Sequence, residues 1–578
     1  MIIRLAGFMG ESPRTIPRLL PDSMAQQAYN TKLDNGALKP IHRARFDKRL
    51  DAQAQTIYLH QGEWIGWDKV VDVVRGPVAE DRLYFTGDGA PKIMVDGETM
   101  NLAVPAPTGK PVAIVSGTPD KDLSSTILYA YTWVTSLGEE SEPSPLSDGV
   151  EWSPGLPVTV RGFSQPPDGR RVTLMRIYRS QTSSTGATDL YFIAERPAGV
   201  GDFVDNGLDL VEPIPSTSFN PPPDDLAGIT ALPNGILAAF SGKRLYFSEP
   251  YYPHAWPEKY VLTTDYEIVG LGAFGSSVAI LTTGTPYIAS GTAPENMVME
   301  KLELNLPCIN ARGIVDLGYS VAYPSHLGLV SISSNGANVV TNGVLTRDQW
   351  LQMNPYSFVA GQFAGRWMAS YAYTDEGGEG KRGIIIIDLS GDQAFLIRNS
   401  DYADSMYYDI SSGALYLLKS GTDIYEWDAI DQPFGEQLWR SKRFVIPTET
   451  NFGALLVEGD DITNAAQKKT LEEKAKAIMA ANRAIMNTNR TGGEIGGAPI
   501  GAVPFGGSLL EAVEHDQSSL AVSVFADDKL VFTTSKLNKV IRLPSGFLAR
   551  TWEIEVRGNI QVSQITMATS ASEMAEGQ

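Results

Sequence analysis

The chain contains one cysteine, five histidines and no long apolar run, and each scarcity excludes a class of protein. A single thiol, Cys308, rules out an intramolecular disulfide framework, so nothing implies an oxidising compartment. The longest β-like apolar burst, Ile384–Ile387, is far shorter than the roughly 18 residues that span a bilayer. The N-terminus also lacks the apolar segment and cleavage site of a secretory signal. We therefore expect synthesis in the cytosol and a buried, inert Cys308.

Positive charge is scarce as well. The 47 Lys and Arg residues are outnumbered by 67 Asp and Glu residues, which leaves a net charge of −20. Broad affinity for nucleic acid or for an anionic membrane requires clustered Lys and Arg side chains. We therefore expect DNA, if it meets this protein, to pass without being held.

Signatures of catalysis and metal binding are missing too. No G-x-S-x-G nucleophile elbow and no H-E-x-x-H zinc motif occurs. We therefore expect no enzyme activity, no cofactor and no metal. The histidines are scattered, and each is expected at the surface or in a turn: His42, His60, His254, His326 and His515.

A repeated β pattern is what the sequence does contain. Each copy has an apolar strand, a Gly-bearing turn and a second apolar or aromatic strand. We predict a mainly β fold with a propeller-like core of about five or six blades, because aligned positions recur at the length of a propeller blade. The copies are 82–95, 235–248, 277–290, 320–333, 366–389 and 414–427, and Ile236, Val278, Val321, Trp367 and Leu415 align at intervals of 42 to 48 residues.

Changes in amino-acid composition along the chain mark the boundaries of the predicted domains. The first sixty residues are predicted to be an extended arm on a neighbouring surface, with one short helical pattern near Asp22 and apolar anchors at Leu19, Leu20 and Leu33. The predicted order is an arm (1–60), a first propeller-like unit (61–111), an insertion (112–222), the propeller-like core (223–435), a C-terminal β domain (436–461 and 509–570) interrupted by a helix plus Gly-rich loop (462–508), and a tail (571–578).

The insertion has the pattern of a β-sandwich. Ile127, Tyr129, Tyr131 and Trp133 alternate with other residues before an acidic, Pro-rich turn. This run and the later R-I-Y-R-S at 176–180 resemble fibronectin type III-like modules of phage tail proteins. The triple proline that follows is predicted to close the insertion as a stiff linker.

The C-terminal β domain is predicted to have one buried and one wet face. The alternation that predicts these faces places Trp552, Ile554 and Val556 between Glu553, Glu555 and Arg557.

The one long helical signal of the chain begins at Asp461. It carries an excess of positive charge and a coiled-coil-like apolar stripe. We consider a surface helix on its own sheet, and we favour a contact with another subunit or partner. The contact residues would be Leu471, Ala475, Ile478, Asn482 and Ile485.

A Gly-rich segment, 491–508, follows the helical signal. A flexible linker is one interpretation. The apolar residues are unusual for a purely solvating tether, which favours a channel gate closed by several subunits. The gate residues would be Ile495, Ile500, Val503 and Phe505.

Taken in order, these elements resemble the tail tubular protein B, or nozzle, family of short-tailed bacteriophages. The resemblance rests on the arm with LLPDSMAQQAYN and L-x-x-G-x-L-x-P, on the blade units, on the fibronectin-like insertion and on the C-terminal sheet that runs to ATSASEM. It spans nearly the whole chain, although 462–508 has no matching feature.

The resemblance implies a structural virion protein that assembles in the host cytoplasm. It implies a homohexameric ring that lines the DNA ejection channel below the adaptor ring of tubular protein A and closes the channel until adsorption. Tail fibres or spikes would be partners, and genomic double-stranded DNA would pass without sequence-specific binding.

Two other classes of function stay open. A receptor- or glycan-binding tail or fibre protein would use Tyr251, Tyr252 and Trp256 as an exposed sugar platform, unless the loop 250–257 packs on its neighbour. A glycan-cleaving propeller enzyme is the third class.

Overall fold

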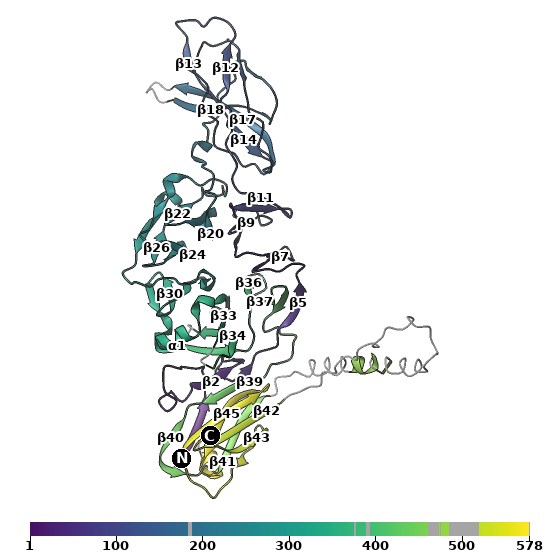
Figure 1. Cartoon of the computed structure of the whole chain (residues 1–578), viewed down its shortest axis with the longest axis vertical. Coiled ribbons are helices and arrows are strands. Elements are labelled where there is room, and N and C mark those ends of the chain that lie inside the picture. The colour runs from purple at the N-terminus through teal and green to yellow at the C-terminus, as the bar shows by residue number, and fades with distance from the viewer. Residues whose placement is uncertain are drawn as a thin grey trace.

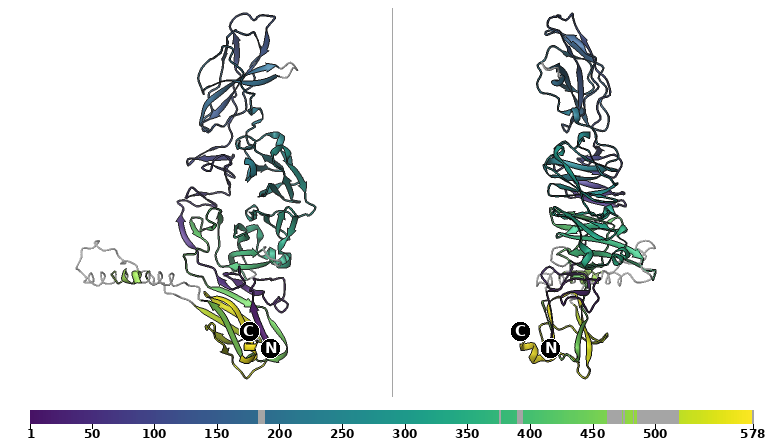
Figure 2. Two further views of the ribbon diagram at one scale, coloured as in Figure 1. Left: turned by 180° about the vertical axis from the view of Figure 1, so that it is seen from behind. Right: turned by 90° about the vertical axis from the view of Figure 1, so that its left-hand side faces the viewer.

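The computed structural model describes residues 1–182, 188–374, 377–388, 394–460 and 519–576, with residues 473, 476–481, 483 and 484. Strands account for 48% of the chain, so the predicted mainly β class is confirmed. In the part of the chain that is described, no helix reaches seven residues. The molecule is elongated, with a sandwich of strands at one end and both termini at the other (Figures 1 and 2).

Six four-stranded antiparallel units, here called the central sheets, form the middle of the molecule. Each predicted repeat supplies the second and third strands of one unit, so the repeat is confirmed as a structural unit. The units are β8 (Asp72–Arg75), β9 (Leu83–Thr86), β10 (Lys92–Val95) and β11 (Glu98–Asn101); β20 (Ala227–Leu232), β21 (Ile236–Ser241), β22 (Arg244–Phe247) and β23 (Leu262–Thr263); β24 (Ile268–Phe274), β25 (Ser277–Thr282), β26 (Tyr287–Ser290) and β27 (Val298–Lys301); β28 (Val315–Asp316), β29 (Val321–Ser325), β30 (Gly328–Ser333) and β31 (Gly336–Val339); β32 (Val359–Phe363), β33 (Arg366–Thr374), β34 (Gly380–Asp388) and β35 (Phe395–Asn399); and β36 (Ser405–Asp409), β37 (Ala414–Lys419), β38 (Asp423–Glu426) and β5 (Arg45–Arg49).

The central sheets stack through their first strands. β20 contacts β8 and β24, and the contacts continue from β24 to β28, β32 and β36. The middle strands are therefore covered on both faces, which explains why apolar residues dominate them. The aligned repeat residues are at most 1% exposed. Among the described residues no closed propeller is found, so the propeller itself remains a prediction.

The insertion folds as two antiparallel layers, here called the sandwich. Tyr129, Tyr131 and Trp133 are fully buried in the core between the layers. One layer contains β12 (Val112–Val115), β16 (Val158–Arg161) and β19 (Phe203–Asp205), with the pair β13 (Ser125–Ile127) and β15 (Val150–Trp152) beside it, and the other contains β14 (Tyr129–Thr135), β17 (Val172–Thr182) and β18 (Thr188–Pro197).

The lower sheets carry both termini (Figure 1). One of them is continuous with the β32–β35 unit, because the N-terminal strand β2 lies between β35 and β39. Its strands after β35 are β2 (Ala25–Tyr29), β39 (Gln437–Ser441), β45 (Ala549–Gly558), β42 (Leu520–Ala526) and β43 (Lys529–Thr534), with β40 (Phe444–Thr450) paired to β45, and the second sheet has β1 (Ile2–Ala6), β46 (Gln561–Ala568), β41 (Ala454–Asp460) and β44 (Ile541–Arg542).

The predicted helix near Asp22 is wrong, because the residues that follow form strand β2. Backbone pairing with β39 overrides a weak local preference for helix. The N-terminal segment packs on its own chain: β1 pairs with β46, and β5 completes the sheet of β36–β38. Of the predicted anchors, Leu20 and Leu33 are buried and Leu19 is exposed.

The predicted wet face of the C-terminal sheet is wrong in part. Trp552, Ile554 and Val556 are buried as expected, but Glu553 is only 3% exposed. Two arginines cover this carboxylate, with Arg440 Nη2 at 2.6 Å and Arg443 Nε at 2.7 Å. The buried Glu555 and the exposed Arg557 pair beside it.

The remaining elements are short connections: hairpins β3 (Thr31–Lys32) with β4 (Lys39–Pro40) and β6 (Thr56–His60) with β7 (Glu63–Trp67), helices α1 (Arg347–Gln352) and α3 (Ala571–Glu576), and 3₁₀ turns at Ser216–Ser218, Pro233–Gly235, Glu258–Tyr260, Pro294–Asn296, Ala311–Gly313, Val340–Gly343 and Pro355–Ser357.

Candidate functional site

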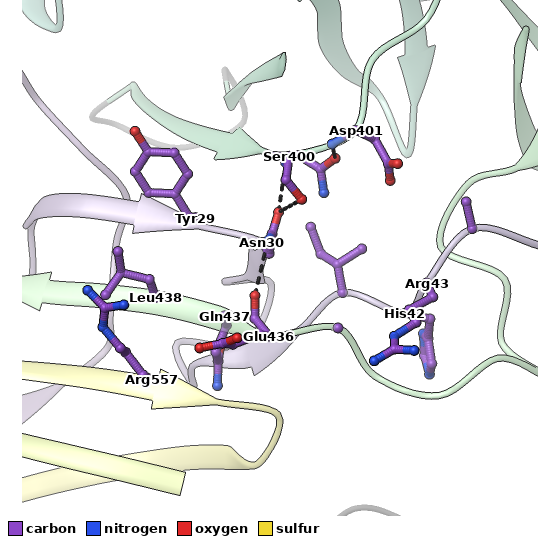
Figure 3. Close-up of a pocket in the computed structure, with 14 residues that line it drawn as sticks. Tyr29, Asn30, His42, Arg43, Ser400, Asp401, Glu436, Gln437, Leu438 and Arg557 are labelled. Atoms are coloured by element: carbon purple, nitrogen blue, oxygen red, sulfur yellow. Dashed lines mark hydrogen bonds between the residues drawn. The ribbon is translucent and has the colours of Figure 1, made fainter. Parts of the chain in front are cut away.

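A polar cleft of about 550 Å³ lies where the N-terminal segment passes between the central and lower sheets (Figure 3). Residues from 29–30, 41–44, 399–401 and 435–438 line it, together with Arg557. We call this region the lower joint. Its lining comes from five separate parts of the chain, so the cleft exists only in the folded protein.

Asn30 ties three of these parts together. It adopts a left-handed conformation (φ 53°), which asparagine tolerates better than most residues. Its Nδ2 donates to the Glu436 carbonyl at 3.0 Å, and its Oδ1 accepts from the Ser400 backbone N–H at 2.9 Å (Figure 3). One side chain therefore holds the strand ends of the central and lower sheets together.

His42 and Asp428 form a second tie beside the cleft. Asp428 Oδ1 accepts from the backbone N–H of His42 at 2.9 Å and lies 3.0 Å from its Nδ1, while Lys32 pairs with the other oxygen. Burial alone would raise the pKa of Asp428, but the hydrogen bond from His42 and the charge of Lys32 lower it. His42 stacks on Phe434 with ring centroids 4.2 Å apart.

This histidine and carboxylate do not amount to a catalytic triad. A triad needs a hydroxyl or thiol that gives its proton to the second ring nitrogen. Within the described residues, no Ser, Thr or Cys side chain bonds to His42. The pair therefore fixes the N-terminal segment to the central sheets.

Glu11 and Arg398 form a third, deeply buried tie. The Glu11 carboxylate accepts from the backbone N–H of Ala28 at 2.9 Å and from Arg398 Nε at 3.0 Å. The Glu11 backbone exchanges hydrogen bonds with Leu396 of β35. This ion pair joins the N-terminal segment to the edge of the central sheets.

Gln437 contributes a polar atom without a partner. The residue is fully buried, its Nε2 donates to the Ile560 carbonyl at 2.8 Å, and its Oε1 accepts no hydrogen bond in the described structure. A cleft with such a lining can hold water or a small polar molecule.

The predicted gate residues Ile495, Ile500, Val503 and Phe505 lie outside the described residues. So do four of the predicted helix contacts, namely Leu471, Ala475, Asn482 and Ile485. Ile478 is described, and it is helical and half-buried.

The predicted sugar platform is wrong. Trp256 is 1% exposed and packs in a core with Tyr84 and Leu237, because the loop 250–257 folds onto the neighbouring unit. Tyr251 and Tyr252 alone remain exposed.

The predicted positions of the cysteine and of the histidines are confirmed only in part. Cys308 is buried as predicted, and burial raises the pKa of its thiol to about 12. His42 is buried and lies outside a turn, so its prediction is wrong; His254 is buried but lies in a turn, and His60 and His326 are half-buried. His515 lies outside the described residues.

Two further classes of site are absent from the described ranges. No cluster of three or more His, Cys, Asp or Glu side chains with metal-binding geometry occurs there. None of the helices in that part of the chain has the length and apolarity to cross a bilayer.

The ties of the lower joint were not predicted from the sequence. His42 and Asp428 are 386 residues apart, and Glu11 and Arg398 are 387 apart. No local pattern marks such pairs, since each residue alone looks like an ordinary surface charge.

No protein-family model matches the chain, and no curated protein sequence matches it either. Functional inference therefore depends on the residues and geometry of this chain itself.

Proposed function

We propose that this chain is a structural, ring-forming subunit of a short-tailed bacteriophage tail: a nozzle that lines the DNA ejection channel and keeps it closed until adsorption. In this proposal six copies form a ring below an adaptor ring, contact tail fibres or spikes, and let double-stranded DNA pass without sequence-specific binding. The proposal includes a propeller-like arrangement of the central sheets and a fibronectin type III-like sandwich.

The observation that carries the proposal is the order of units along the molecule. Six repeated four-stranded sheets contact one another through their first strands, a sandwich interrupts the series after the first unit, and a lower sheet ends the chain. A cleft of about 550 Å³ has Arg75 from the first unit and Asp409 from the last among its lining residues, so the series bends back on itself. This order of units supports the proposed resemblance to the nozzle family.

The charge of the chain supports a conduit. Each copy carries −20, and a channel that a polyanion must traverse works best when it offers phosphate groups no adhesion. The polar side chains around the cleft hold distant segments of the chain together, which suits a structural subunit.

The gate belongs to the same proposal. A pore can be closed by apolar side chains on a flexible backbone, which occlude it without adhering to DNA. Deleting residues 494–506 should give particles that assemble but lose their genome early. The proposed gate residues are Ile495, Ile500, Val503 and Phe505.

Electron microscopy of the purified full-length chain, alone and mixed with assembled tails, tests the proposal. We expect six-fold rings with a central pore. Isolated particles or trimers under all conditions would contradict a nozzle and favour a fibre protein.

A further inference from the structure

Unpaired polar atoms gather at the upper joint, where the sandwich meets the first two central units. The residues that carry them come from β9 and its start, from two loops of the sandwich and from the loop after β22. Of the ten buried side-chain atoms that lack a hydrogen-bond partner in the described structure, six lie here: Arg82 Nε, Tyr84 Oη, Glu139 Oε1, Arg170 Nε, Arg170 Nη1 and His254 Nδ1.

His254 faces Glu139 without bonding to it. The imidazole Nε2 donates to the Glu140 carbonyl at 2.9 Å, which leaves Nδ1 as a lone pair in the neutral ring. This lone pair lies 3.9 Å from Glu139 Oε1, so two acceptors oppose each other. The other oxygen of Glu139 accepts from Arg170 Nη2 at 2.7 Å.

The unpaired atoms include both donors and acceptors. Arg82, Arg170 and Tyr84 offer N–H and O–H groups, whereas Glu139 and His254 offer lone pairs. A bound anion would satisfy the donors but would be repelled by the Glu139 carboxylate. Water can both donate and accept, and buried water commonly fills sites of this kind.

The sandwich is attached here without a shared sheet. In the described ranges no strand of the sandwich pairs with a strand of the central sheets. Side chains and loops make the contacts: Arg170 donates to the Leu102 carbonyl, and Asn220 donates to Glu142. Such a joint can open locally at less cost than unfolding a sheet.

We propose that the upper joint is hydrated and responds to protons: ordered water links Tyr84, Arg170 and Glu139, and protonation of His254 loosens the hold on the sandwich. This inference does not depend on the proposed function.

The charges around His254 set the direction of the response. Burial lowers the pKa of His254, and Arg170 adds to this effect, while Glu139 and Glu140 act against it. The rings of Phe219 and Tyr252 pack on the remaining sides. Protonation of His254 is therefore less favourable in the closed joint than in the open joint. Lowering the pH below the ordinary histidine pKa of about 6.5 shifts the equilibrium toward the open joint.

Amide hydrogen exchange of the full chain between pH 8 and pH 5, corrected for intrinsic exchange, tests the proton response. The reporters are the backbone N–H groups of Ala255 and Trp256, which bond within the joint to Tyr252 and Asn220. We expect their protection to fall between pH 8 and pH 5 by at most about 30-fold, because an open-state pKa of about 6.5 lies only about 1.5 units above pH 5.

Two variants make this test specific. In His254→Gln, the amide can still donate to the Glu140 carbonyl but takes up no proton, so the protection should not change with pH. In His326→Gln, a half-buried histidine that contacts Tyr356 far from the joint, the wild-type response should persist. The proposal would be overturned if His254→Gln lost as much protection as the wild type between pH 8 and pH 5. It would also be overturned if the wild type lost no protection over this range.

Tyr84→Phe tests the hydration. If a water molecule is hydrogen-bonded to the Tyr84 hydroxyl, removal of the hydroxyl should lower the midpoint of thermal unfolding. If the hydroxyl has no hydrogen-bond partner, removal of the hydroxyl should raise this midpoint. Tyr323→Phe is the matched control, because Tyr323 is equally buried and its hydroxyl donates to the Leu306 carbonyl at 2.9 Å. The midpoint of thermal unfolding of this variant must therefore fall. A raised midpoint for Tyr84→Phe would refute a hydrated joint.

Discussion

At the lower joint the chain crosses between units through β-sheet hydrogen bonds, whereas at the upper joint it crosses through side chains and loops. Below, β2 pairs with both β35 and β39, and buried charges such as Glu11 and Asp428 have partners. Above, Glu139 also pairs with Arg170, but both side chains and that of His254 keep further unpaired atoms, whereas the described lining of the lower cleft has one such atom, Gln437 Oε1.

The difference shows how one chain can combine a rigid and a responsive connection. Because backbone pairing and paired charges join them, we expect the lower sheets and the central sheets to unfold together. Unpaired buried groups make the upper joint the weaker connection, because each one removes stability that a partner would supply. A nozzle subunit would need both properties: a firm wall, and an outer module that can respond.

Removing whole segments should give the largest effect. Deleting residues 1–30 removes β1 and β2, separates β35 from β39 and leaves β35, β39 and β46 each with one unpaired edge, so we expect insoluble protein. Replacing residues 112–210 of the sandwich with a Gly/Ser linker should leave a folded chain with one cooperative transition. The yield of soluble protein and the thermal unfolding curve are measured for each of the two variants. A well-folded chain without residues 1–30 would contradict the contrast between the two joints.

Sequence patterns predicted the parts whose cause is local. Val278 and Trp367 lie in apolar runs bounded by turn residues, and the alternation through Tyr131 marks a sandwich strand; the structure places all three in cores. The helix predicted near Asp22 failed because the pairing partner of β2 lies some 400 residues away.

The candidate site was beyond prediction for the same physical reason. Local spacing cannot show that His42 meets Asp428 or that Arg440 covers Glu553. A lone charge in a sequence looks solvated, and only the fold reveals whether a distant partner buries it.

Breaking the Glu11–Arg398 pair should give the next largest effect. Glu11→Ala leaves the Arg398 guanidinium without its buried partner, which should lower the free energy of unfolding by about 3–5 kcal/mol. Glu63→Ala, which removes an exposed partner of Lys48, should cost less than about 1 kcal/mol. Urea unfolding at pH 7 compares the two variants. Similar decreases in the free energy of unfolding would contradict a special role for the lower joint.

The tie at Asp428 should make stability depend on pH. Because the pKa of Asp428 is lowered by folding, its contribution is present above the unfolded value near 3.8 and is lost as pH falls through the folded value. Asp428→Asn should therefore cost about 1–3 kcal/mol at pH 7, and this cost should shrink as the pH falls below 3.8. Asp148→Asn, at an exposed pair with Lys110, is the control; an equal pH profile in both variants would argue against the tie.

The smallest effect should come from the exposed rim of the upper joint. Glu98 pairs with Arg171 of the sandwich, but both side chains are open to solvent. Glu98→Gln should change the free energy of unfolding by less than about 1 kcal/mol, and added salt should reduce the change further. A loss as large as that of Glu11→Ala in the same urea experiment would show that surface charge holds the sandwich.

Amide hydrogen exchange of the whole chain at a single pH of 8 tests the contrast between the joints most directly. Ala28 of β2, whose N–H bonds to the Glu11 carboxylate, reports on the lower joint, and Trp256, whose N–H bonds to the Asn220 carbonyl, reports on the upper one. We predict that Ala28 exchanges only with global unfolding of the sheets, and that Trp256 exchanges through a local opening of clearly lower free energy. Equal protection at the two sites, or stronger protection at Trp256, would contradict this account.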